Sequence, residues 1–166
     1  LRKTKTDKAD ALTIAKKLAT DLSSDRFKPD FNMQELKFLT HHRNRLTDSR
    51  SKLKTQYIRL LDILFPELAG FIGKTNLHYQ YVYDLLTKYP SPAKLSRAHT
   101  NALVKLLHNH GNRLDMAQQL KVLAKQSIGL SSPANALELV QTISVIRLYD
   151  EQINAIDQEI AQIMNS

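Results

Sequence analysis

The sequence predicts an all-α protein whose frame is a pair of long helices. Apolar residues recur with a helical period along nearly the whole chain. Only 4 Gly and 5 Pro interrupt its 166 residues. Leucines stand seven positions apart at Leu39, Leu46, Leu53 and Leu60. A seven-residue apolar repeat is typical of a helix that lays one stripe against a partner helix.

The first long helix is expected over residues 33–65. No Gly or Pro occurs between residue 33 and Pro66, so nothing breaks the pattern there. At 1.5 Å per residue the helix would be roughly 48 Å long, which is long for a chain of this size. A second column runs beside the leucines and consists of Leu36, Arg43, Arg50, Tyr57 and Leu64. Its two arginines would need acidic partners if buried.

The second long helix is expected over residues 133–166. Ser132 followed by Pro133 is a start signal, because a Ser oxygen can cap the helix and Pro suits its first turn. Its two columns are Leu139, Ile146, Ile153, Ile160 and Thr142, Tyr149, Ile156, Ile163. We predict that the two helices form an antiparallel coiled coil. Glu151, Asp157 or Glu159 would then face the arginines of the first helix.

The remaining segments follow from helix breaks. Residues 1–24 are expected to hold one helix and residues 25–32 a linker, because Pro29 forbids a continuous helix. Residues 66–132 are expected to form a cap of short helices, with a turn at 68–71 and a helix over 76–88. Two helices of this cap could form a DNA-binding helix-turn-helix motif or simply pack as a helical hairpin. Its tyrosines could likewise stack on bases or pack in a core.

Composition excludes several classes of protein. The chain has no Cys, so disulfides and thiolate metal sites are impossible. No apolar run approaches the roughly 18 residues of a membrane span, and no signal peptide is seen. The first residue is not Met, so we expect a piece of a longer protein. The net charge of +8 suits a polyanionic partner, although excess charge also keeps proteins soluble.

The candidate chemistry lies near the start of the chain. Asp7 and Asp10 are three apart at a helix start and therefore share one face. Two carboxylates on one face can contribute hard oxygen ligands to Mg²⁺. The same residues could instead only complement the helix dipole.

The run from Arg2 to Ala15, with Lys-Thr-Asp-Lys-Ala-Asp-Ala at its centre, resembles the last catalytic motif of the DEDD transposases of insertion sequences. These are enzymes of the IS110 type, related to the pilin-gene invertase. The arginine-rich long helix, Phe65-Pro66-Glu67-Leu68, Tyr89-Pro90-Ser91-Pro92 and the last long helix are similar too. The resemblance spans nearly the whole chain, and its most specific part is the Asp-x-x-Asp run.

The resemblance implies an RNase H-like (RuvC-like) catalytic domain whose last helix is residues 1–24. Asp7 and Asp10 would match the third and fourth acidic residues that bind two Mg²⁺ ions for DNA cleavage and strand transfer. The other two would lie on strands before residue 1 and the nucleophilic Ser after residue 166, so we expect the isolated chain to be inactive. The implied partners are DNA, a structured guide RNA and further copies of the chain, in the bacterial cytoplasm at the nucleoid.

The long helix offers the candidate nucleic-acid contacts. These are Lys37, Arg43, Arg45, Arg50, Lys52 and Lys54. Cations along a rod suit phosphate binding, which would depend on salt. Two other interpretations stay open. The charges could form a solvated face with local ion pairs, and the chain could be a non-enzymatic coiled-coil scaffold or a DNA-binding regulator.

Overall fold

A computed structural model describes residues 7–20, 31–107 and 112–165. All regular structure in these residues is helical, which confirms the all-α prediction. In chain order the helices are α1 (Asp7–Thr20), α2 (Phe31–Leu64), α3 (Glu67–Ile72), the 3₁₀ turn η1 (Lys74–Asn76), α4 (Gln80–Lys88), α5 (Pro92–Ser96), α6 (Thr100–Leu106), α7 (Arg113–Gln126) and α8 (Pro133–Asn165). The chain forms two units, residues 1–38 and residues 39–166.

The first unit contains α1 and the first turns of α2. In α1 the apolar side chains of Leu12 and Ile14 are 59% and 60% exposed. Phe31 and Met33 at the start of α2 are similarly exposed. This unit therefore presents apolar side chains to solvent. The predicted linker over residues 25–32 lies mostly outside the described residues.

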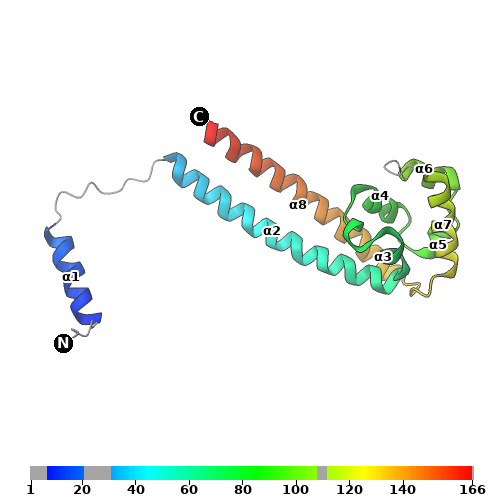
Figure 1. Cartoon of the computed structure of the whole chain (residues 1–166), viewed down its shortest axis with the longest axis horizontal. Coiled ribbons are helices and arrows are strands. Elements are labelled where there is room, and N and C mark those ends of the chain that lie inside the picture. Colours follow the sequence, from blue (N-terminus) through cyan, green and yellow to red (C-terminus); the bar gives the residue numbers. More distant parts are fainter. Residues whose placement is uncertain (1–6, 21–30, 108–111, 166) are drawn as a thin grey trace. The chain divides into compact units, whose positions relative to one another are not determined.

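In the second unit α8 runs beside α2 in the opposite direction (Figure 1). Arg43 pairs with Asp157 and Arg50 pairs with Asp150. A step of seven residues forward on α2 thus matches a step of seven residues back on α8. Nearer the cap, the Gln56 side-chain amide donates to the Glu138 carboxylate at 2.6 Å.

We call the sides of α2 and α8 that these ion pairs join the seam. The heptad residues of both helices become more buried toward the cap. Tyr57, Leu60 and Leu64 are buried on α2, whereas Leu39, Leu46 and Leu53 are half-buried. On α8 the buried members are Leu139, Thr142, Ile146, Ile153 and Ile156. Each fully buried Leu or Ile contributes about 1.5–3 kcal/mol before entropy is counted. The seam is therefore strongest where it joins the cap.

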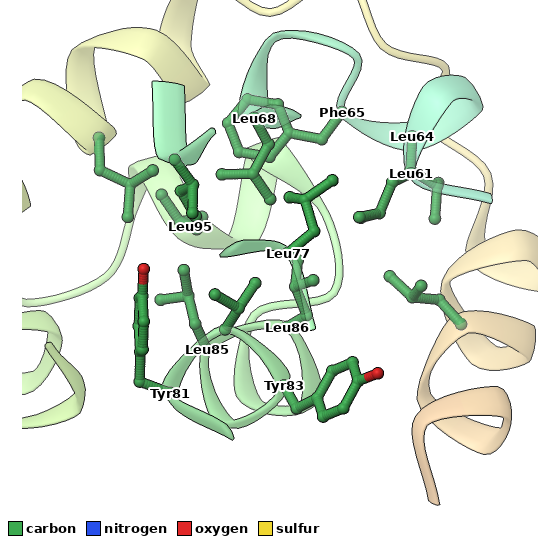
Figure 2. Packing of buried hydrophobic residues seen from close by; sticks show 14 of the residues in the cluster. Leu61, Leu64, Phe65, Leu68, Leu77, Tyr81, Tyr83, Leu85, Leu86 and Leu95 are labelled. Carbon is green, nitrogen blue, oxygen red and sulfur yellow. The ribbon is translucent and has the colours of Figure 1, made fainter. Parts of the chain in front are cut away.

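The cap consists of α3 to α7 on one continuous core. Helix α4 packs on α8 and on α6, and α7 receives α3, α5 and α6. Figure 2 shows leucines from α2, α3, α4 and α5 and from the segment before α4 pointing into the same cluster. The labelled members are Leu61, Leu64, Phe65, Leu68, Leu77, Tyr81, Tyr83, Leu85, Leu86 and Leu95. Helices this short are unstable alone, so packing against one another stabilises them.

Local chemistry sets the helix ends. Pro66 stands two residues after Leu64, the last residue of α2, and its missing N–H cannot continue the helix. The Ser132 hydroxyl accepts the Asn135 N–H at 3.2 Å, as the predicted start of α8 requires. Two predictions were wrong. Residues 68–71 lie in the helix α3, whose six residues are held by the buried side chains of Leu68 and Ile72, and α4 begins at Gln80 because η1 occupies residues 74–76.

The link between α7 and α8 crosses the end of α2. The Leu130 N–H donates to the Ile63 carbonyl at 2.8 Å, backbone to backbone. A Cβ on Gly129 would lie 2.0 Å from the Leu64 carbonyl oxygen. The Glu67 carboxylate accepts the Ser127 hydroxyl at 2.7 Å and the Ile128 N–H at 2.9 Å. Burial opposes ionisation of Glu67, but these hydrogen bonds outweigh it and lower its pKa. The link is thereby fixed to the α2–α3 corner.

Candidate nucleic-acid interface

One side of α2 turns away from α8 and carries exposed cations. Arg45, Lys52 and Arg59 are exposed and seven residues apart. Positions seven apart return to nearly the same side of a helix, about 10.5 Å further along it. We call these three residues the basic ridge. Asp48 is exposed on the same side and reduces the net charge of the ridge.

Arg43 and Arg50 lie on the opposite side of α2, in the seam with α8. The pKa of Arg43 is raised, first by its hydrogen bond to Asp157 and then by the charge of Asp157. The same hydrogen bond lowers the pKa of Asp157. Asp157 was among the expected partners, whereas Asp150 was not among them. These two guanidiniums neutralise carboxylates of α8, so they are poorly placed to bind phosphate.

The last two predicted cations have different surroundings. Lys37 is exposed and belongs to the first unit. Lys54 is half-buried, and its charge helps lower the pKa of His78. Of the six predicted residues, the structure thus exposes Lys37, Arg45 and Lys52. Arg59 joins them because it continues the seven-residue step from Lys52, a signal the sequence already contained.

A ring cluster joins α2 to α4 beside the seam. Tyr57 and Tyr83 meet edge to face, with ring centroids 5.2 Å apart, and the Nδ1 of His78 lies 2.8 Å from the Tyr83 hydroxyl. The Tyr57 hydroxyl donates to the Leu77 carbonyl. Burial raises the pKa of Tyr57 and, with the Asp150 charge, raises that of Tyr83 to about 12. These tyrosines are buried packing residues and do not offer a surface for base stacking.

The tyrosines of the cap differ in their exposure to solvent. Tyr81 is buried, while Tyr79 is 55% exposed. Tyr83, which the sequence left open, is 1% exposed. Only Tyr79 of these three could therefore meet a base.

A carboxylate-rich cavity of about 300 Å³ lies between α4 and α8. Its charged lining residues are Asp84, Arg147, Asp150 and Glu151. Arg147 donates to Asp84 at 2.6 Å and lies over the Tyr83 ring, 5.8 Å from its centroid. The surplus of negative charge makes this cavity unsuitable for phosphate.

Asp7 and Asp10 lie on the first turn of α1, so the backbone places them on one helical face. The Asp10 side chain is half-buried. Among the described residues no three His, Cys, Asp or Glu side chains gather where they could hold a metal ion. Two carboxylates therefore form at most part of a metal site in this chain.

A further finding concerns membranes: in the part of the chain that the structure describes, each helix is too short or too polar to cross a bilayer.

Comparison with known proteins gives one family. Residues 1–66 match the sequence model of the DEDD transposases of the IS110 type, described as transposase. Neither a curated protein nor a solved structure matches the chain. The matched stretch contains Asp7, Asp10 and the whole of α2. The match supports the identification of the chain as part of an IS110-type DEDD transposase, with residues 1–66 carrying the family's pattern.

Proposed function

We propose that this chain is part of a transposase that cleaves and transfers DNA strands, and that it supplies two metal ligands and a nucleic-acid-binding helical domain. The observation that carries the proposal is the match of residues 1–66 to a family of DNA-cleaving enzymes. The matched residues include Asp7 and Asp10, which lie on one face of α1. Helix α1 exposes Ala11, Ile14 and Ala15, which share one side of the helix. This suits a helix whose apolar side packs on a catalytic sheet in the full-length enzyme.

Asp7 and Asp10 are the residues that would hold Mg²⁺. Carboxylate oxygens are ligands of the right kind for this ion. When bound, a pair of such ions activates and stabilises the oxygens of phosphoryl transfer. Two carboxylates cannot fix two ions, so the isolated chain is expected to leave DNA uncut. In the full-length enzyme these aspartates would orient one side of the metal site.

Substitution of these aspartates tests the assignment. In the full-length transposase, Asp7→Asn or Asp10→Asn should abolish strand transfer, because the neutral amide keeps the shape but loses the charge that binds the cation. Calorimetric titration with Mg²⁺ should show weaker binding in parallel. Glu159→Gln, the same loss of a carboxylate charge at an exposed site on α8, is the matched control and should leave both unchanged. Normal strand transfer by either of the first two variants would refute the assignment.

The paired helices are proposed to form an antiparallel coiled coil. Its support is the repeated seven-residue register of Arg43 with Asp157 and Arg50 with Asp150. The family's expected oligomer would use the outer side of α8, where Val145 and Leu148 are exposed. These two residues lie within about 60° of each other around the helix, at 100° per residue. A single monomeric species in sedimentation at micromolar concentration would contradict this part of the proposal.

Nucleic-acid binding is proposed for the basic ridge, with Lys37 on the same helix as a further contact. The ridge residues are exposed and evenly spaced, and Lys or Arg contacts to phosphate release counterions. Duplex DNA and a structured RNA share this backbone chemistry. Competition between the two for the chain, measured across a salt series, distinguishes the guide-RNA partner from DNA alone.

The rival proposal, a helical scaffold or DNA-binding regulator without a catalytic parent, draws support from the fact that residues 67–166 lie outside the family match. The reading frame upstream decides between them. Strands carrying an Asp and a Glu before residue 1 favour the transposase, and an unrelated frame favours the rival.

A further inference from the structure

A groove on the cap carries positive charge and hydroxyl groups but no carboxylate in its lining. It has two parts, with cavity volumes of about 470 Å³ and about 320 Å³. Both parts are lined by Ser91, Ala93 and Ser131, so they adjoin. The groove runs from the first turns of α8 across α5 to the end of α7, helices that Figure 1 shows at the cap.

The charge of the lining is one-sided. Lys88, Lys94 and Lys125 line the groove, and all three are exposed. Neither part includes an Asp or a Glu among its lining residues. The cavity between α4 and α8 is the opposite case, since it holds three carboxylates and one arginine. The groove is therefore complementary to an anion.

The hydroxyl groups add donors to this charge. Ser91 accepts the Lys94 N–H and Ser132 accepts the Asn135 N–H, each as a helix cap. A hydroxyl that accepts in this way still has its own hydrogen to donate. At the far end Ser127 donates to Glu67 instead, so that end is less suited to an anion. The anion-binding part is thus the stretch between Lys88, Lys94 and Ser132.

The small lining residues decide which anion fits. Ser, Ala and Pro dominate the walls, so an extended chain can approach the backbone closely, while Leu137 and Val140 provide an apolar side. A duplex is a stiff rod, whereas a single strand can bend into a groove between helix ends. A single strand presents phosphates to the lysines and hydroxyls, and its sugars to the apolar side. An acidic peptide would match the charge, but the family's substrates are nucleic acids.

We propose that this groove binds the phosphate backbone of a single-stranded stretch of nucleic acid. The proposal rests on the proposed nucleic-acid function and adds a second site for a different form of the ligand. The basic ridge on α2 takes duplex or folded backbone, and the groove takes the unpaired strand. Binding in the groove is independent of base sequence, because the lysines and hydroxyls of the lining contact phosphate, and phosphate contacts carry no sequence information.

The experiment measures binding of fluorescent oligothymidine and of a duplex to the 166-residue chain by anisotropy over a range of salt. The groove variant is Lys88→Gln with Lys94→Gln. Its affinity for oligothymidine should fall at least about tenfold, and the slope of log affinity against log salt should shrink by about 1.4, since each lost phosphate contact on a single strand contributes about 0.7. The matched control, Lys74→Gln with Lys105→Gln, changes exposed lysines outside the groove and should bind like the parent chain.

Two further variants separate the sites. Ala93→Glu places a carboxylate where the two parts of the groove adjoin and removes no lysine, so it should cause the same loss for oligothymidine. The ridge variant, Arg45→Ala with Lys52→Ala and Arg59→Ala, should lose duplex binding and keep oligothymidine binding. A ridge variant that keeps duplex binding refutes the ridge and leaves the groove intact.

Three results overturn the groove proposal. The first is oligothymidine binding that the groove variant retains. The second is a parent chain that binds duplex but no oligothymidine, which leaves the proposed function standing. The third is displacement of oligothymidine by polyglutamate when the carboxylate concentration of the peptide equals the phosphate concentration of the oligothymidine. That result would assign the groove to an acidic peptide.

Discussion

At the scale of single residues, the sharpest constraint is the contact between two backbones at Gly129. The added Cβ of any other residue would meet the Leu64 carbonyl oxygen at 2.0 Å and the Leu64 carbonyl carbon at 2.5 Å. Neither is the end of a flexible side chain, so the chain itself would have to move. The neighbouring hydrogen bond from Leu130 to Ile63 resists that movement.

Gly129→Ala is therefore expected to destabilise the fold by about 3 kcal/mol, the upper range for forcing extra atoms into a packed site. Urea unfolding followed by circular dichroism gives the free energy. Gly70→Ala is the matched control, because a Cβ there has no atom within 4 Å. Gly70 also lies inside α3, where Ala is the better helix former. Equal stabilities for the two variants would show that the α7–α8 link does not touch α2.

His78 gives the fold a dependence on pH. Its pKa is lowered first by burial and then by the Lys54 charge, while the Asp150 charge acts in the opposite direction. The neutral ring is thus favoured in the folded state, and the unfolded chain binds the proton first as pH falls. Stability contributed by His78 is full above its unfolded pKa near 6.5 and decreases as pH falls through that value.

The melting temperature should therefore fall between about pH 7.5 and 5.5, and this fall should be smaller in His78→Asn. The amide of Asn can take the place of Nδ1 near the Tyr83 hydroxyl without titrating. His99→Asn alters an exposed histidine and should keep the slope of the parent chain. If His78→Asn keeps the full slope, other groups carry the pH dependence.

At the scale of elements, the register between α2 and α8 depends on charged pairs. Side chains of Arg50 and Asp150 are only 25% and 29% exposed, whereas those of Arg43 and Asp157 are 38% and 43% exposed. The inner pair is less screened by water and should contribute more to stability. Removing one partner leaves a half-buried charge alone, which is the costly case.

A double-mutant cycle on Arg50→Met and Asp150→Leu should give a coupling free energy of about 1 kcal/mol by thermal or urea unfolding. The same cycle on Arg43 and Asp157 should give a smaller coupling and serves as the comparison. The exchange of charges, Arg50→Asp with Asp150→Arg, should recover most of the loss. Zero coupling at the inner pair would mean that these helices lie apart in solution.

Much of this element structure could be predicted from the sequence. Both long helices were predicted to within a few residues from the leucine repeat, Pro66 and the Ser132-Pro133 start. Apolar periodicity and helix-breaking or helix-capping residues are local signals, so they can be read from the sequence. The short helix α3 could not be predicted, since Gly70 disfavours it locally and only the burial of Leu68 and Ile72 in the cap stabilises it. Asp150 as the partner of Arg50 required the register, which is fixed only when two distant segments meet.

At the scale of the whole chain, the candidate site was predicted unevenly for the same reason. The cations of α2 were visible in the sequence, but their division between seam and ridge depends on which side α8 covers. The groove was not predicted, because its lining comes from the ends of α4, α5, α7 and α8. The spacing of residues within one helix cannot predict a lining that four separate helices supply.

The hydrogen bonds between Arg43 and Asp157 join residues 114 positions apart. Everything between them leaves this point and comes back to it as a hairpin. Sequence continuing from either end of that hairpin starts from neighbouring places, even though more than a hundred residues separate the ends. The ion pair therefore closes a long loop of the chain, and the entropy cost of closing a loop rises only slowly with its length.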